Sequence, residues 1–445
     1  MRLKLLSALL LCVLAVRFVP ALSSSLDLNS NSNSTASWLK KRDALIDAVF
    51  GYGPGILTKK SEPDDILTWP KSTPNVQGLV WNLSTHFFEI NSTVFYSPVN
   101  PGKRTESAFF FHHGHSNCVC PTEKGDPVIV GAKCRPGCNS SMPSRGEIGM
   151  KGYSWWDLYN VSDWIHSMGY DDYIFSMPLK GINLGPGTTD TFLNTNHWWF
   201  LDFEEKGDSP LRYFIEPVVL TANYAKARGY KEIHMAGLSG GGWTTTFAPA
   251  IDKRIVTSFP IAGSVPCAMR NPDGLVPNQT WTGNDDEDYE QSCMPTNAPK
   301  KGGDDMPGRA AYAACNFTCQ YLLAGLEPER FQVQVLHEYD SCCFSPHGRH
   351  DQMLAYEHSI RTELSANGRA AGWFTSTANA HVKHEVAAQD KTIIENALRG
   401  RWQPGSQSWN EIDCDILHGG GSSCAADVEP GCALNPKNPP SGYDC

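Results

Sequence analysis

One strand–turn–helix segment constrains this chain more than any other part of its sequence. A β-rich run at residues 232–236 leads directly into the run Gly-Leu-Ser-Gly-Gly at 237–241, and a helical stretch at 243–250 follows. A turn this tight forces its central residue into a strained backbone, and the glycines on either side let the helix pack against the strand. Ser239 is therefore predicted to project its hydroxyl from a sheet edge, close to the N–H groups of a helix start.

Short β-rich runs alternate with helical stretches around this segment. Residues 79–90 and 93–96 are predicted to form antiparallel edge strands. Further strands are predicted at 107–112, 173–177, 232–236, 255–261, 331–336 and 373–377, and helices at 38–50, 216–228, 243–250, 353–365 and 391–398. The helix at 216–228 is expected to carry Pro217 in its first turn, where the missing N–H is harmless. This alternation predicts an α/β fold with a mostly parallel central sheet and helices on both faces.

The chain is predicted to hold one large α/β domain with additions at both ends. Residues 1–22 combine a positive start, an apolar run and small residues, which is typical of an export signal peptide. We expect residues 23–78 to be an N-terminal extension, 79–402 the α/β domain and 403–445 a Cys-rich tail. The connection at 263–330 is too long for a plain loop and contains four cysteines, so we expect a disulfide-braced insertion.

Cysteines and glycosylation sequons predict the same compartment. The chain has 15 cysteines, one of them in the export signal, and the even number that remains favours disulfides. The alternative is zinc at the pairs Cys118/Cys120 and Cys134/Cys138, which an oxidising compartment and the lack of a matching His pair disfavour. N-glycosylation sequons lie at Asn33, Asn82, Asn91, Asn139, Asn160, Asn278 and Asn316. A secreted, extracellular glycoprotein is expected.

Composition and charge exclude several other classes of protein. Hydrophobic residues make up 41% and charged residues 19% of the chain, which excludes a disordered chain or a coiled coil. A net charge of −10 without basic runs predicts no nucleic-acid partner. No segment after the export signal is long and apolar enough to predict a membrane span. We expect no cofactor and no metal, since the histidines at 112, 113 and 115 lack a partner carboxylate motif, and the oligomeric state stays open.

The turn at 237–241, in this context, resembles the nucleophile turn of the α/β-hydrolase superfamily. From about residue 79 to 398 the chain is similar to the secreted, serine esterase-like members of that superfamily. The resemblance implies a catalytic triad in the chain order serine, acid, histidine. It implies an acid after the strand at 331–336 and a histidine after the strand at 373–377.

Both implied positions hold suitable residues. The loop after residue 336 contains Asp340 and Glu338, and we expect Asp340 to be the acid because it lies where the loop can aim at an imidazole. Glu338 is the alternative. His384 resembles the family's histidine just before the final helix, with His381 as the alternative.

Two backbone donors are candidates for the oxyanion hole. The N–H of Gly240 follows the nucleophile, and the N–H of His115 lies at the end of the strand at 107–112. With Ser239, Asp340 and His384, they predict a serine hydrolase that cleaves a small-molecule or polymer-borne carboxylic ester through an acyl-enzyme. One alternative is a serine peptidase of the same fold, whose relatives often carry a large domain for which this chain has no room. The other is a non-catalytic binding protein on a hydrolase scaffold, which the filled triad positions disfavour.

Overall fold

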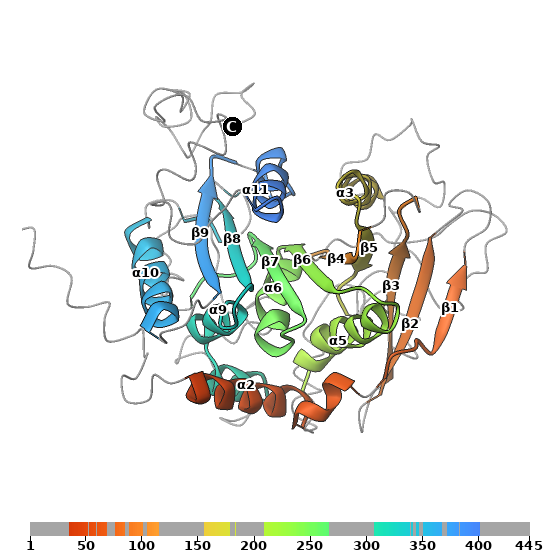
Figure 1. The fold of residues 1–445 in the computed structure, drawn as a ribbon, viewed down its shortest axis with the longest axis horizontal. Helices are drawn as coiled ribbons and strands as arrows, with labels where there is room; N and C mark the ends of the chain where they lie inside the picture. Colours follow the sequence, from red (N-terminus) through yellow and green to blue (C-terminus); the bar gives the residue numbers. More distant parts are fainter. Residues whose placement is uncertain are drawn as a thin grey trace, which may run out of the picture.

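A nine-stranded sheet forms the centre of the described part of the computed structural model (Figure 1). Its strands lie side by side in the order β1-β2-β3-β5-β4-β6-β7-β8-β9. They span Asp65–Thr68 (β1), Gln77–Ser84 (β2), Glu89–Ser97 (β3), Ser107–His112 (β4), Asp171–Phe175 (β5), Glu232–Leu238 (β6), Ile255–Ile261 (β7), Phe331–His337 (β8) and Trp373–Asn379 (β9). The structure describes residues 35–51, 53–58, 60–68, 76–84, 89–100, 105–114, 155–178, 183, 209–266, 307–338, 340, 344–346, 350–366, 372–381 and 383–400.

The sheet is antiparallel at one side and parallel through the rest. β1 pairs antiparallel with β2, β2 with β3, and β3 with β5, whereas β5, β4, β6, β7, β8 and β9 pair in parallel. Parallel strands end at the same edge of a sheet, so the loops after β4, β6, β8 and β9 meet there. This strand order, with the serine turn after β6, gives the chain the α/β-hydrolase fold.

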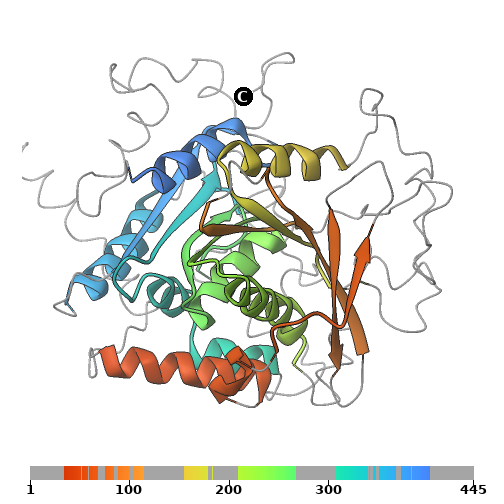
Figure 2. The same cartoon turned by 45° about the vertical axis from the view of Figure 1, so that its right-hand side comes forward.

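Helices cover both faces of the sheet (Figure 2). They span Thr35–Phe50 (α2), Gly53–Thr58 (the 3₁₀ helix η1), Trp155–Ser167 (α3), Leu211–Ala227 (α5), Gly240–Ile251 (α6), Pro307–Ala314 (α8), Phe317–Ala324 (α9), His350–Ala366 (α10) and Ala388–Leu398 (α11). Alternate side chains of β4 point to opposite faces of the sheet. Phe109 and Phe111 belong to the apolar cluster with α3 and α11, and Phe110 belongs to the cluster with the helices of the other face. None of the described helices is both long and apolar enough to cross a bilayer.

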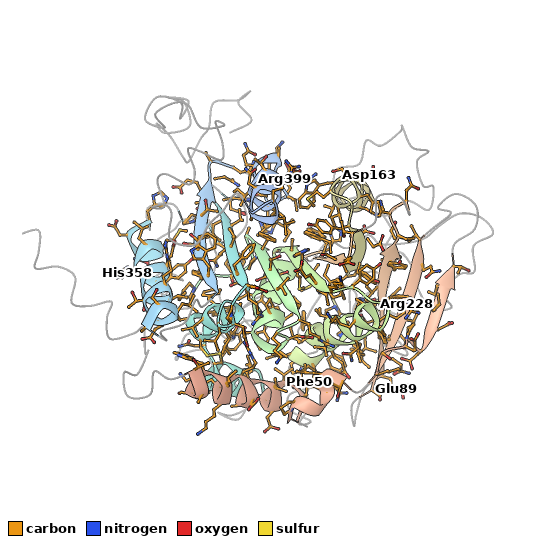
Figure 3. The ribbon with its side chains drawn as sticks, viewed as in Figure 1. Phe50, Glu89, Asp163, Arg228, His358 and Arg399 are labelled. Atoms are coloured by element: carbon orange, nitrogen blue, oxygen red, sulfur yellow. A yellow bond between two sulfur atoms is a disulfide. The ribbon has the colours of Figure 1, made fainter. Side chains whose placement is uncertain are left out.

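The helices α3 and α11 lie together on one face, as the side chains in Figure 3 show near Asp163 and Arg399. Trp164 of α3 donates a 2.9 Å hydrogen bond from its indole N–H to Glu395 of α11. Lys391 of α11 lies 5.7 Å from the centre of the same indole ring. These contacts hold α11, which follows the loop of the predicted histidines, against α3.

An arginine joins the N-terminal helix α2 to the other face. Arg42 is buried and donates hydrogen bonds to the carbonyls of Ala250 in α6 and Leu323 in α9, at 2.9 and 2.7 Å. It also forms an ion pair with Glu327, which a second buried arginine, Arg330, contacts from the other side. The helix therefore packs as part of the same body as the sheet.

The predicted element boundaries differ from the structure most at two places. The run at 79–90 is two strands, since β2 ends at Ser84 and β3 begins at Glu89. Helix α5 begins at Leu211, so Pro217 lies inside it instead of in its first turn. Proline inside a helix costs about 3 kcal/mol, and burial of the apolar side chains in the first turns of α5, among them Phe214, offsets that cost.

The predicted insertion at 263–330 contains α8 and α9, with a disulfide between Cys315 and Cys319 at their junction. Several predictions lie outside the described residues. They concern the export signal at 1–22, the tail at 403–445, most of the insertion, the sequons at Asn33, Asn139 and Asn278, and the oxyanion donor His115.

Candidate functional site

Ser239 lies on the turn between β6 and α6, at the edge where the parallel strands end. Its backbone has φ 59° and ψ −129°, a conformation that residues with a Cβ adopt rarely. Two backbone hydrogen bonds keep it there, from Ser239 N–H to Ile261 at 3.0 Å and from Trp243 N–H to the Ser239 carbonyl at 2.9 Å. The serine is 6% exposed, so only a small part of it can reach a substrate.

Neighbouring glycines make this turn possible. A Cβ on Gly237 would collide with the carbonyl of Gly241, and a Cβ on Gly241 would collide with the carbonyl of His112 at the end of β4. The turn is therefore pressed both onto its own helix and against β4. These close approaches are the physical reason for the small residues that the motif contains.

The loop after β4 passes directly beside the serine. A Cβ on Gly114 would lie 2.6 Å from Ser239 Cβ and 3.3 Å from Ser239 Oγ. Gly240, whose N–H is the other predicted oxyanion donor, is the first residue of α6. The segment that leads into His115 thus reaches the serine hydroxyl.

Asp340 and His384 are in direct contact. His384 Nδ1 lies 2.9 Å from Oδ2 and 3.1 Å from Oδ1 of Asp340. The aspartate side chain has no exposed surface, and that of the histidine is 10% exposed. A carboxylate only accepts hydrogen bonds, so Nδ1 carries the hydrogen and the neutral ring keeps its lone pair on Nε2. That tautomer is the one a general base requires.

The alternative residues have other partners. Glu338 contacts His350, whose Nε2 lies 2.5 Å from its carboxylate. His381 Nε2 lies 3.6 Å from Glu385 Oε1. The structure therefore brings Asp340, and not Glu338, into hydrogen-bond distance of His384 Nδ1 among the contacts described.

A second buried pair, which the sequence analysis missed, lies behind Asp340. His337, the last residue of β8, has Nδ1 3.4 Å from Asp340 Oδ2 and Nε2 3.1 Å from Asp390 Oδ2. Asp390 belongs to α11 and is 53 residues from His337 in sequence. The only local signal for this pair is the i,i+3 spacing of His337 and Asp340.

His113, just after β4, is an uncharged part of the interior. His113 is buried, and burial together with the neighbouring His112 lowers its pKa to about 3. His112 Nδ1 lies 2.7 Å from the backbone carbonyl of His113. Within the described part of the chain, no group of His, Cys, Asp and Glu side chains could hold a metal ion.

Solved structures similar to this chain have low sequence identity to it. Acetyl xylan esterase 1 from Thermoanaerobacterium sp. JW/SL YS485 is 11% identical with a TM-score of 0.46, and the match covers 83% of this chain and 94% of that one. Est1E from Butyrivibrio proteoclasticus is 12% identical with a TM-score of 0.34, covering 72% and 97%. Pyrococcus horikoshii acylaminoacyl peptidase is 10% identical with a TM-score of 0.39, covering 76% and 44%.

No family model matches the chain, and no curated protein matches it by sequence. The fold assignment rests on the strand order, the parallel core and the turn at Ser239.

Proposed function

We propose that this protein is a serine hydrolase that cleaves carboxylic esters with Ser239, His384 and Asp340 as its triad. The observation that carries the proposal is the contact of His384 Nδ1 with the buried Asp340 carboxylate, at the sheet edge where Ser239 occupies its strained turn. A serine hydroxyl is a poor nucleophile at its own pKa, and an adjacent histidine held in the correct tautomer supplies the missing base.

The reaction follows from these roles. Ser239 Oγ attacks the ester carbonyl carbon while its proton passes to His384 Nε2. The tetrahedral intermediate collapses, the carbon–oxygen bond to the alcohol breaks, and the alcohol leaves with the proton from His384. Water then attacks the acyl-enzyme, with His384 again accepting the proton and returning it to Ser239 as the acid leaves. Asp340 stabilises the imidazolium in both halves and stays ionised.

The proposed oxyanion donors are the backbone N–H groups of Gly240 and His115. The close approach of Gly114 to Ser239 Oγ supports this, because the next residue along the chain is His115. Donors that are fixed before the reaction stabilise the developing negative charge without reorganisation, and each contributes on the order of 10²–10³ in turnover.

Labelling with a fluorophosphonate tests the nucleophile. We expect an adduct on Ser239, found by peptide mass mapping and absent from Ser239→Ala. The matched pair is His384→Ala, which should lose the adduct, and His381→Ala, which should keep it. An unlabelled protein that is folded and has its disulfides intact would overturn the proposal and favour a non-catalytic binding role.

Matched ester and amide substrates test the bond that is cleaved. The protein should hydrolyse activated short-chain esters much faster than the corresponding anilides, because an ester releases a better leaving group. Equal rates on both would replace the esterase proposal with a serine peptidase of the same fold.

We also propose that the protein is secreted and glycosylated. Asn82, Asn91 and Asn316 are exposed, which glycosylation of their sequons requires, and the described Cys315–Cys319 disulfide supports an oxidising compartment. Expression of the full chain in a eukaryotic secretory host should yield protein in the medium that begins after residue 22. Removal of N-glycans should lower its mass. Retention of the unmodified full-length chain inside the cells would contradict this proposal.

A further inference from the structure

Behind the proposed triad, a buried histidine stands between two carboxylates. His337 has no exposed surface. Its Nε2 lies 3.1 and 3.2 Å from the two carboxylate oxygens of Asp390, and its Nδ1 lies 3.4 Å from Asp340 Oδ2. Asp340 in turn contacts His384. The four side chains therefore form a continuous chain from α11 to the proposed general base.

Asp390 is fixed at the far end of this chain. It has no exposed surface. Its Oδ1 accepts a 2.6 Å hydrogen bond from the amide of Asn379, the last residue of β9, and its Oδ2 accepts one of 2.7 Å from the N–H of Ala387. One donor is part of the sheet, and the other directly precedes α11. The carboxylate is thus a rigid support for His337.

Two carboxylates flank His337, and they stabilise an imidazolium more than a neutral ring. Nε2 lies within hydrogen-bond distance of Asp390, whereas the 3.4 Å contact of Nδ1 with Asp340 is an ion pair without hydrogen-bond geometry. Burial lowers the pKa of His337, but the carboxylates of Asp390 and Asp340 outweigh that effect and raise it to about 9.

His381 is the other titratable group that faces His337. Its ring packs edge-on against His337 with 5.0 Å between ring centres. Burial and the positive charge of His337 lower the pKa of His381, while Asp390 and Glu385 act in the opposite direction. This neighbour therefore agrees with a charged His337 and does not compete for its proton.

We propose that His337 is a positioning residue for the hydrolytic site. Held by Asp390, it fixes the Asp340 carboxylate, and Asp340 in turn orients His384. This inference rests on the proposed function, since it assigns His337 and Asp390 a task in the same site. It extends the triad by a buried ion pair that touches neither substrate nor nucleophile.

The arrangement also sets the charge that His384 experiences. Asp340, His337 and Asp390 together carry one net negative charge, and loss of the imidazolium would raise that to two. A more negative neighbourhood favours the protonated form of His384, which cannot act as a base. Replacing His337 with a neutral residue should therefore shift the acid limb of the pH profile upward by about one unit.

The first experiment measures kcat/KM against pH on an activated short-chain ester. His337→Gln keeps a hydrogen-bond donor and removes the charge, so its acid limb should move up by about one pH unit. The control is His234→Gln. His234 is a buried histidine of β6 that lies 2.8 Å from Thr257 Oγ1, and burial lowers its pKa to about 4, so it is uncharged.

The control variant should keep the wild-type acid limb. A His337→Gln enzyme that loses activity at every pH, with its acid limb in the wild-type position, would reduce His337 to a structural role and overturn the inference.

The second experiment requires no activity. In ¹⁵N-histidine-labelled wild-type protein, NMR should show one imidazole that keeps both protons at about pH 8, and His337→Gln should lack that signal. If that variant fails to fold, Asp390→Asn serves instead and should lower the pH at which the signal titrates. A His337 that is neutral at about pH 8 in the wild type overturns the inference. A wild type that hydrolyses no ester counts against the proposed function alone.

Discussion

Gly114 lies directly against Ser239, with room for a hydrogen atom and for nothing larger. A Cβ added to this glycine would lie 2.6 Å from Ser239 Cβ, 2.8 Å from the Leu238 carbonyl oxygen and 3.3 Å from Ser239 Oγ. Backbone and a side-chain stem occupy that space, and neither can rotate away. The loop after β4 and the turn after β6 are therefore fitted to each other at the hydroxyl.

Gly114→Ala should separate these two segments and misplace the proposed oxyanion donor. We expect turnover of an activated ester to fall on the order of 10²-fold while the protein still folds, as checked by circular dichroism and steady-state kinetics. Gly55→Ala is the matched control, because a Cβ there meets nothing within 4 Å. Full activity in Gly114→Ala would contradict the proposed role of this loop.

Asp340→Asn should abolish the function of His384 without disturbing the fold. An amide can donate a hydrogen bond to Nδ1 and so stabilise the wrong tautomer, and it removes the charge that stabilises the imidazolium. We expect kcat to fall about 10⁴-fold. Glu338→Gln removes a charge two residues away, on a side chain that contacts His350, and should leave kcat close to wild type. A larger loss in Glu338→Gln than in Asp340→Asn would identify Glu338 as the acid.

The strained backbone of Ser239 should be measurable as stability. Glycine adopts φ 59° without the cost that a Cβ imposes, so Ser239→Gly should unfold with a free energy about 1 kcal/mol higher than Ser239→Ala. At Thr392, an exposed position inside α11, the same comparison should reverse, with glycine about 1 kcal/mol less stable than alanine. Denaturant unfolding of the four variants tests this. If the glycine variant were more stable than the alanine variant at both positions, or less stable at both, the prediction would be contradicted.

Strands that are buried on both faces could be predicted from the sequence, because they are short runs rich in apolar and β-branched residues. β7 spans the predicted residues 255–261, and β4 spans the predicted 107–112. β1 could not be predicted, since its four residues are mostly exposed and pair only with β2 at the edge. Helices α8 and α9 were missed because they lie in a segment whose cysteines and long connection masked any helical period.

The residues of the proposed site also fall into those that could be predicted from the sequence and those that could not. Asp340 and His384 follow strand ends, so the resemblance to a known fold was enough to propose them before any geometry. His337 and Asp390 meet because α11 docks beside the end of β8. Apart from the i,i+3 spacing of His337 and Asp340, their surrounding residues do not distinguish them from ordinary strand and helix positions. Contacts of that kind depend on how elements pack, which a sequence pattern does not contain.

Acid should weaken the attachment of α2 through Glu327. Burial raises the pKa of this carboxyl, but the contacts with Arg42 and Arg330 outweigh burial and lower it to about 2, from 4.5. The stabilisation is therefore complete above about pH 4.5 and is lost as the pH falls toward 2. Because the carboxylate is partly exposed and solvent screens its ion pairs, we expect the free energy of unfolding to fall by on the order of 2 kcal/mol.

Denaturant unfolding at neutral pH and at about pH 3 checks this expectation. Glu327→Gln should be less stable than wild type at neutral pH, because it leaves the buried Arg42 and Arg330 without their carboxylate, and the difference should shrink in acid. The control is Glu62→Gln, which removes a surface partner of Arg228 and should change the free energy of unfolding by less than about 0.5 kcal/mol at either pH. A difference between Glu327→Gln and wild type that stays constant with pH would mean that the carboxylate is not the charged group that holds α2 in place.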